Sequence, residues 1–394
     1  MADGSRQRLI RLTSIFFASM LVGCASLAIR EPSLSTDELL SGVAVFGEVV
    51  SAFEAPEIDV LALDDAMRAF IEEHVGRSGN SVARFRRLLN ELESQGFFNA
   101  TYDAGKTNSA IDTFHNRSGN CLSFTNLFVA LGREANLETA YQIVDVPPSW
   151  DAHNGYLIRF THINVVIKGT PFDRINTGQY TVDFNDIVPN REYPRREVSD
   201  NYAKGLFYSN LSVTALRDGD VRRSFAYLKK AIDLEPHNAD MWINLGAFFA
   251  SQAAHEEAIQ AYQVALGVKR TSKASMSGLA RSYAAIGDKE RAAMYATKVR
   301  RYRQKNPFYH FAVAQAEFKN SNYTLAIRAI DKAIDLRRRN PRFHLLRGLA
   351  EQQLGDDEAA EKSFDKAKRY GKSDLNKLKM REDILSLNSG QPLS

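Results

Sequence analysis

A repeat with a period of about 34 residues runs through the second half of the chain and limits what that half can fold into. Small residues recur at this interval at Ser224, Ala258, Ala292, Ala326 and Ala360. Two parallel ladders keep the spacing, one mostly of small residues (Ala231, Ala265, Val299, Ala333, Ala367) and one mostly of larger ones (Leu228, Tyr262, Ala296, Ile330, Phe364). Small positions let two helices approach closely, and large ones fill the space between them. The period therefore predicts stacked helix pairs, with the turn inside alternate pairs at Gly219-Asp220, Gly287-Asp288 and Gly355-Asp356.

The second unit of this array resembles the tetratricopeptide repeat, because Trp242, Leu245, Gly246, Ala258, Tyr262 and Ala265 fall on the family pattern. The first unit departs from it at Ser212 and Ser224, and the fourth at Glu317. The resemblance implies five repeats over residues 201–373, followed by a capping helix and tail over 374–394. It also implies a protein or peptide partner in the concave groove of the solenoid.

Charge divides the chain into two unlike halves. Residues 201–394 carry 33 Lys and Arg against 21 Asp and Glu, whereas residues 1–200 carry 18 against 26. The basic residues form two clusters, Arg300-Arg301-Tyr302-Arg303 and Arg337-Arg338-Arg339 with Arg342. They are either a solvated rim or a site for an anionic protein or envelope polymer. A length of 394 residues also exceeds one ordinary core and predicts two or three domains.

The amino end has the layout of an export signal. Arg6, Arg8 and Arg11 precede the mostly apolar stretch 12–23, whose 12 residues reach only about 18 Å as a helix, too short for a ~30 Å membrane core. The stretch ends in Leu21-Val22-Gly23-Cys24, which resembles the bacterial lipoprotein processing box. The resemblance implies removal of residues 1–23 and acylation of Cys24, and an ordinary signal peptide is the alternative.

Residues 24–36, which contain Pro32 and polar residues, are then expected to form a tether to the membrane. Ala25, which is not aspartate, implies by the same resemblance an outer membrane lipoprotein facing the periplasm of a bacterial envelope. Export disfavours nucleic acid as a partner.

A cysteine at a helix start is the main chemical signal in the middle of the chain. Gly119-Asn120 supplies a turn and a cap, and Cys121 is followed by apolar residues at helical spacing: Leu122, Phe124, Leu127, Phe128 and Leu131. The N–H groups and dipole of a helix start favour thiolate over thiol, so Cys121 is a candidate nucleophile. The competing interpretation is a buried small hydrophobe.

Two predicted strands follow, and each contains a residue that can serve a nucleophilic cysteine. Residues 156–167 contain His162 and residues 179–184 contain Asp183. On adjacent antiparallel strands, His162 can take the thiol proton while Asp183 orients the ring. His153 and Asp186 are the alternatives for these two roles. Cys24 and Cys121 lack the paired spacing of a zinc site, and no metal or cofactor is expected.

The order of helix-start cysteine, strand histidine and strand aspartate resembles the transglutaminase-like cysteine hydrolase superfamily over about residues 80–190. Gly119-x-Cys121, Leu127, Leu131-x-Arg133 and Asn136-Leu137 match the helix of its bacterial members. The resemblance implies that Cys121 is the nucleophile, His162 the general base and Asp183 its orienter, with the Cys121 N–H in the oxyanion hole. Two departures are His162-Ile163-Asn164 in place of His-Ala-Trp, and Phe184-Asn185 after the aspartate.

Together these features predict an α+β papain-like, transglutaminase-like domain over residues 37–198, followed by an all-α tetratricopeptide solenoid. The expected function is a membrane-anchored envelope cysteine hydrolase or acyltransferase that acts on an amide or peptide bond through a thioester. The alternative is a non-catalytic lipoprotein scaffold that binds envelope proteins.

Overall fold

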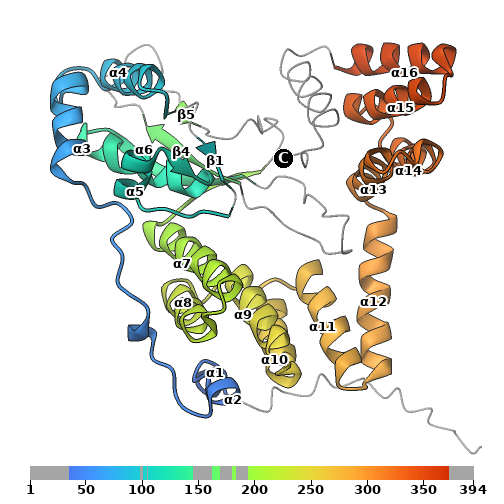
Figure 1. Cartoon of the computed structure of the whole chain (residues 1–394), viewed down its shortest axis with the longest axis horizontal. Helices are drawn as coiled ribbons and strands as arrows, with labels where there is room; N and C mark the ends of the chain where they lie inside the picture. The colour runs from blue at the N-terminus through green and yellow to red at the C-terminus, as the bar shows by residue number, and fades with distance from the viewer. Residues whose placement is uncertain are drawn as a thin grey trace, which may run out of the picture. The chain divides into compact units, whose positions relative to one another are not determined.

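The computed structural model describes residues 35–97, 101–103, 105–144, 162–168, 180–182 and 194–371 (Figure 1). Residues 1–34 with Cys24, and the tail from residue 372, lie outside them. Within the described part, no helix is both long enough and apolar enough to cross a membrane.

An α/β domain precedes the helical repeats. Its helices are α3 (Asp65–Phe70), which continues as one π turn, η2 (Ile71–Val75), then α4 (Ser81–Ser94), α5 (Ala110–Asn116) and α6 (Cys121–Glu134). Its main sheet has the order β5-β4-β3-β6, formed by β3 (Glu138–Val144), β4 (His162–Lys168), β5 (Tyr180–Val182) and β6 (Arg195–Val198), all antiparallel. A short parallel pair, β1 (Thr101–Tyr102) and β2 (Ser118–Gly119), precedes α6.

The sheet buries one face against α6. Alternate strand residues, such as Tyr141 of β3 and Val165 of β4, join Leu127 and Phe128 of α6 in one apolar core. This alternation is the period of two that places every second side chain on the same face of a strand. Both predicted strands are present in the described residues, as His162–Lys168 and Tyr180–Val182, and they pair antiparallel as expected.

The repeats form ten helices whose phase follows the period of the sequence. The first helices of the five pairs are α7 (Asp200–Arg217), α9 (Ala239–Ser251), α11 (Lys273–Ala285), α13 (Pro307–Lys319) and α15 (Pro341–Gln353). The second helix of each pair begins one repeat period after the second helix of the pair before it. These helices are α8 (Val221–Leu234), α10 (His255–Val268), α12 (Lys289–Gln304), α14 (Tyr323–Leu336) and α16 (Asp357–Tyr370). The predicted fold class, an α+β domain followed by a helical-repeat solenoid, is confirmed.

The turn inside each pair has the same backbone conformation in all five units. A residue with positive φ stands at Gly219, Ala253, Gly287, Ser321 and Gly355, again at the spacing of the repeat. The sequence predicted this turn only in the three units that have glycine. The second and fourth units make the same turn with a side chain present.

Close packing explains both the matches to the repeat pattern and the departures from it. The ring of Tyr262 occupies the space that a Cβ at Gly246 would need, at 2.7 Å, and the space at Gly278 is tighter still. In the first unit the buried Ser212 and Ser224 hydroxyls hydrogen-bond each other at 2.9 Å, so the polar pair is satisfied.

One residue of the ladder of larger side chains does not pack between helices as the spacing predicted. Ala296 is exposed and fills no gap between helices. On α12, Tyr295 and Val299 are the buried side chains instead. The third unit therefore has a thinner apolar face than its neighbours.

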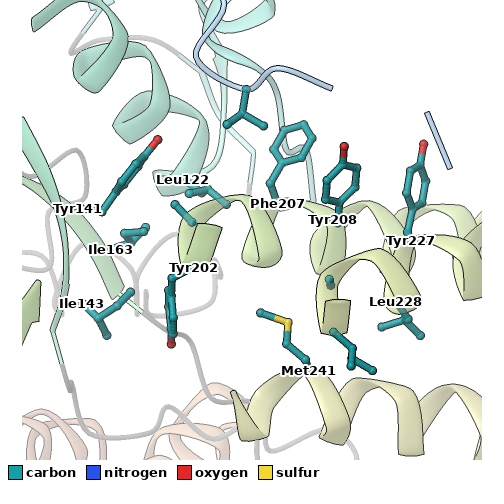
Figure 2. Close-up of a cluster of buried hydrophobic side chains, with 14 of the residues drawn as sticks. Leu122, Tyr141, Ile143, Ile163, Tyr202, Phe207, Tyr208, Tyr227, Leu228 and Met241 are labelled. Carbon is teal, nitrogen blue, oxygen red and sulfur yellow. The ribbon is translucent and has the colours of Figure 1, made fainter. Parts of the chain in front are cut away.

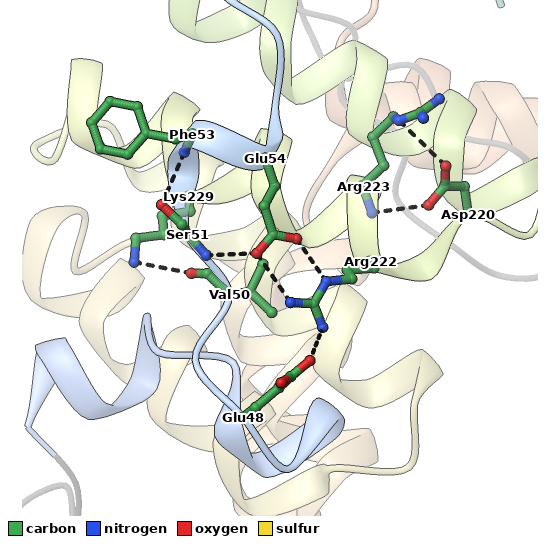
Figure 3. Close-up of polar contacts among 9 residues, drawn as sticks. All are labelled: Glu48, Val50, Ser51, Phe53, Glu54, Asp220, Arg222, Arg223 and Lys229. Atoms are coloured by element: carbon green, nitrogen blue, oxygen red, sulfur yellow. Dashed lines mark hydrogen bonds and ion pairs between the residues drawn. The ribbon is translucent and has the colours of Figure 1, made fainter.

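Residues 35–58 pack on the first repeat. They contain α1 (Thr36–Leu39), α2 (Val43–Phe46) and the 3₁₀ turn η1 (Ala52–Glu54). Arg222 of α8 binds both carboxylate oxygens of Glu54, at 2.6 and 3.0 Å, and also Glu48 at 2.7 Å (Figure 3). The Phe46 ring meets Phe225 of α8 edge-on. This amino-terminal segment is thus held by both ionic and aromatic contacts.

The α/β domain and the first repeats share a continuous core. Tyr141 and Ile163 from the sheet lie in the same buried cluster as Tyr202 and Phe207 of α7 (Figure 2). Tyr208 of α7 also accepts a hydrogen bond from the Ile58 N–H at 2.9 Å. This core continues through α12, and α13 to α15 have a smaller separate cluster.

Candidate active site at the start of α6

The turn before α6 has a conformation that requires glycine. Gly119 has φ of 150°, and a Cβ there would lie 2.5 Å from the Cβ of Ser123. The next residue, Asn120, caps the helix, because its side-chain oxygen accepts a hydrogen bond from the Ser123 N–H at 3.1 Å. The predicted cap and the predicted helix start at Cys121 are both confirmed.

A neighbouring loop, residues 106–108, forms hydrogen bonds to this turn. The Asn120 N–H donates to the Lys106 carbonyl at 2.9 Å, and the Asn120 amide donates to Thr107 Oγ1 at 2.7 Å. The Asn108 N–H donates to Ser123 Oγ at 2.8 Å. Because Asn108, Asn120 and Ser123 are all buried, these bonds are shielded from water and fix the first turn of α6.

Sequence reasoning missed this loop. Asn108 and Ser123 are 15 residues apart, and their hydrogen bond joins a loop to a helix. No local pattern marks such a pair. The one available signal was the polar run before α5, where Ser109 caps the helix and binds Asp112.

Cys121 stands on the first turn of α6 and is partly exposed. The first turn of a helix presents backbone N–H groups that have no partner inside the helix, together with the positive end of its dipole. A sulfur atom there lies where negative charge is favoured and where a reagent can approach. This is the environment in which a thiolate acts as a nucleophile.

The strand that begins with His162 lies against the same part of α6. Thr125, one turn after Cys121, is fully buried. Its hydroxyl donates to the Cys121 carbonyl at 2.7 Å and lies 3.4 Å from the carbonyl oxygen of Ile163. The predicted nucleophile and the predicted base thus belong to adjacent elements, α6 and β4, and the Thr125 hydroxyl bridges the backbones of these two elements.

The orientation of His162 follows from its strand. Ile163 and Val165 join the core with α6, so His162, which alternates with them, shares its face of the sheet with Asn164. His162 is 3% exposed. As the first residue of β4, it lies at the end of the strand beside the first turns of α6.

The other predicted site residues lie outside the described part of the chain. Asp183 directly follows β5, whose last residue Val182 pairs with Val165 of β4. His153 and Asp186, the alternatives, are also outside it. Among the residues that the structure describes, no cluster of three or more His, Cys, Asp or Glu side chains offers a metal site.

The far end of α6 is tied to the first repeat. Arg133 binds Asp200, in the first turn of α7, through two hydrogen bonds of 2.6 and 2.8 Å. The Arg133 guanidinium lowers the pKa of the Asp200 carboxyl, and the carboxylate raises the pKa of Arg133. The helix that carries the candidate nucleophile is therefore linked directly to the solenoid.

Comparison with known proteins assigns both regions. The family described as the transglutaminase-like superfamily matches residues 68–163, and the tetratricopeptide repeat family matches residues 210–275, 277–337 and 311–374. The tetratricopeptide repeat-containing protein trd-1 of Caenorhabditis elegans is 21% identical over 214 residues, which are 54% of this chain and 27% of that protein. The chain thus spans about a quarter of the length of this curated relative.

Among solved structures, the MamA protein is 19% identical and covers 43% of this chain and 92% of its own, with a TM-score of 0.25. YrrB, described as a tetratricopeptide repeat protein with an unusual peptide-binding site, is 14% identical, covering 45% of this chain and 91% of its own, with a TM-score of 0.24. By its family matches, the chain carries a transglutaminase-like domain at residues 68–163, followed by tetratricopeptide repeats over residues 210–374.

Proposed function

We propose that the protein is a cysteine hydrolase that cleaves an amide or peptide bond, with Cys121 as the nucleophile. The observation that carries this proposal is the partly exposed Cys121 on the capped first turn of α6, beside the strand that begins with His162. The transglutaminase-like match supports the reaction class, which is acyl transfer through a thioester.

The reaction has two steps. His162 takes the proton of the Cys121 thiol, and the thiolate sulfur attacks the carbonyl carbon of the substrate. The C–N bond breaks, the leaving nitrogen takes the proton from His162, and the acyl group remains on sulfur as a thioester. Water, deprotonated by His162, then attacks the thioester carbon, the C–S bond breaks, the acyl group leaves as a carboxylic acid, and the Cys121 sulfur takes back the proton from His162 as the thiol. An amine in place of water gives transfer instead of hydrolysis.

The fixed first turn of α6 supplies the electrostatic part of the mechanism. The Cys121 N–H is assigned to the oxyanion hole, because donors that are already oriented stabilise developing negative charge best. The bonds from residues 106–108 hold that turn in place before substrate arrives. Asp183 is assigned as the orienter of His162, since it follows the strand paired with β4.

The second candidate function is a non-catalytic binding module. The orientation of His162 favours it, because the strand alternation gives this residue the face of the sheet opposite to the α6-facing core. In that case the α/β domain serves as a platform, and the solenoid alone recruits a protein.

Alkylation of Cys121 separates the two functions. In a Cys24→Ser chain Cys121 is the one remaining thiol, and its rate of reaction with iodoacetamide at pH 7 is followed by intact mass. We expect the His162→Ala variant to react about tenfold more slowly, because the base that promotes thiolate formation is absent. His74→Ala, a change of a more exposed histidine elsewhere in the same domain, is the matched control and should leave the rate unchanged. If His162→Ala matches the parent chain, or if Cys121 reacts only in denaturant, the hydrolase proposal is wrong.

Membrane anchoring through an acylated Cys24 is part of the same proposal. Its support is the processing box at residues 21–24. In a bacterial host, Cys24→Ser should move the protein from the membrane fraction to the soluble fraction, and intact mass should show the loss of the acyl chains. Equal membrane recovery of the two forms would rule out the lipid anchor.

The proposed role of the solenoid is to hold a protein or peptide partner, which the tetratricopeptide repeats support. An anionic partner from the bacterial envelope fits the charge of the second half of the chain.

A further inference from the structure

The carboxyl ends of the second helices, where one repeat meets the next, carry a recurring pair of neighbouring residues, one apolar or aromatic and one basic. The pairs are Val268-Lys269, Tyr302-Arg303 and Leu336-Arg337, which recur once per repeat at the same position. They stand where α10, α12 and α14 end. The corresponding pair at the end of α8 is Leu234-Glu235, so the basic series begins with the second repeat. Because the period places equivalent residues on one edge of the stack, the three pairs form a row, here called the junction edge.

Acidic residues are sparse in the sequence around the basic pairs, and only Asp335, which directly precedes Leu336, adjoins one of them. No Asp or Glu occurs between Glu257 and Asp288, between Glu290 and Glu317, or between Asp335 and Glu351. Each of these stretches spans one junction between repeats. Apart from Asp335, neighbours along the chain do not neutralise the positive charge at the junction edge.

The arginines next to two of these pairs belong to the same edge. Arg300 and Arg301 precede Tyr302, and Arg338 and Arg339 follow Arg337. All four are exposed, and within the described residues none of them lies in an ion pair. Arg347, on the first helix of the fifth repeat, differs from these four because it lies close to the carboxylates of Asp331 and Glu351. Accumulated like charge with no partner costs self-repulsion, which a negative ligand would relieve.

Aromatic rings hold other arginines of the same edge in place. The Arg337 guanidinium lies 5.5 Å from the Phe308 ring centre, Arg342 lies 5.3 Å from Phe311, and Arg303 lies 5.8 Å from Tyr309. Stacking on a ring fixes the plane of the guanidinium. A guanidinium with a fixed plane is suited to bind a carboxylate through two hydrogen bonds.

The row also has an apolar component. Val268 and Leu336 are 41% and 45% exposed, and each directly precedes a basic residue. Neighbouring helix axes lie about 8–10 Å apart, and each repeat has two helices, so successive junctions lie roughly 16–20 Å apart. An extended chain covers this distance in about six residues. A ligand that matches the row is therefore a polypeptide with acidic groups about six residues apart and apolar side chains beside them.

We propose that the junction edge of repeats two to five binds an acidic, partly apolar polypeptide segment in extended form. This rests on the proposed role of the solenoid as a holder of a protein partner, and it names the chemistry of that partner and the surface that it occupies. We favour a polypeptide over a lipid surface for two reasons. The exposed cations here are arginines, and several of them adjoin arginines that are stacked on aromatic rings. The row is also linear.

The test uses the full chain and a designed probe. The probe is a fluorescent peptide of about 20 residues with three Glu-Glu pairs about six residues apart, each beside a leucine, and its partner peptide has Gln-Gln instead. Anisotropy titrations compare the parent chain with the R300Q/R301Q/R338Q/R339Q variant. The matched control, K289Q/R328Q/K362Q/K366Q, removes the same charge from exposed positions on the second helices. Helix content of all three is checked by circular dichroism.

We expect the Glu peptide to bind the parent chain, and binding to weaken about tenfold in the junction variant and by less than about twofold in the control. Binding should also weaken as salt is raised, and the Gln peptide should not bind. Equal losses in both variants would mean that only net charge matters, and the proposal would be wrong. It would also be wrong if phosphatidylglycerol vesicles bound the parent chain through these arginines while the peptide did not. Since the titration does not involve the thiol, an inert Cys121 would leave this result unaffected.

Discussion

The two ends of the solenoid are stabilised by cores of different size. The first three repeats share one apolar cluster with the α/β domain and with the amino-terminal segment, whereas α13 to α15 depend on a separate cluster around Phe311 and Phe343. The division falls after α12, where Ala296 is exposed and only Tyr295 and Val299 are buried. A one-dimensional array is only as cooperative as its interfaces. The difference implies that the last two repeats open more readily than the first three.

The largest expected effect is from a change in the larger core. Tyr262 is 2% exposed and fills the space between Gly246 and Gly278. Tyr262→Ala should lower the free energy of unfolding by about 3–5 kcal/mol, because it leaves a cavity that the two glycines cannot fill. Urea denaturation followed by circular dichroism should show the main transition at lower urea. A midpoint that stays at the parent value would contradict the assignment of Tyr262 to a shared core.

A change in the smaller core should act locally. Phe343 is fully buried against Phe308 and Phe311, with ring centres 5.8 and 5.0 Å away. Phe343→Leu removes part of this contact and should cost about 1–2 kcal/mol. Hydrogen exchange should accelerate in α13 to α16 while α7 to α10 keep their protection. Equal acceleration in both groups would show that the solenoid opens as one unit.

The link between α6 and the first repeat gives a pH-dependent effect of intermediate size. Arg133 lowers the folded-state pKa of Asp200, so the pair stabilises the fold above the unfolded carboxyl pKa of about 3.9. That stability is lost as pH falls through the lower folded-state value. Asp200 is 54% exposed, and screening by solvent limits the effect to about 1 kcal/mol.

Asp200→Asn should therefore destabilise the chain at pH 7, and the difference from the parent should shrink as pH falls below about 4. Urea midpoints measured across this pH range test the sign. Glu256→Gln is the control, since Glu256 stands in the first turn of α10 without an ion pair among the described residues. A pH dependence of the same size in the control would assign the effect to the helix dipole instead of the Arg133 contact.

The sequence predicts local features well and long-range contacts poorly, and the two regions show why. The start of α6 was predictable because Gly119, Asn120 and Cys121 are adjacent and act through one turn. The loop that holds this turn was not, since Asn108 reaches Ser123 across a helix and a strand. In the repeats, the period located every helix pair because each pair packs on the pairs next to it, and this packing repeats along the chain.

Two further features of the repeats had no local signal. The contact of residues 35–58 with α8 depends on Arg222 meeting Glu48 and Glu54, which lie far away in the chain. The second feature is the division of the core after α12. On α12 the ladder of larger residues has only an exposed alanine, Ala296, although the spacing alone made this position look like a match to the ladder.

The smallest expected effect compares the turns of unlike repeats. Ala253 and Ser321 adopt φ of 59° and 60° at the position that glycine occupies in the other three units. A left-handed conformation costs a residue with a Cβ about 1–2 kcal/mol. Glycine avoids this cost, but part of the gain is offset because glycine has greater conformational freedom in the unfolded chain. Ala253→Gly and Ser321→Gly should therefore each stabilise the protein by about 0.5 kcal/mol, and Gly287→Ala should destabilise it by a similar amount. The urea transition of the larger core reports Ala253→Gly, whereas exchange of α13 and α14 reports Ser321→Gly, because the two turns belong to different clusters. If Ser321→Gly moved the main transition as much as Ala253→Gly does, the division between the two cores would not hold.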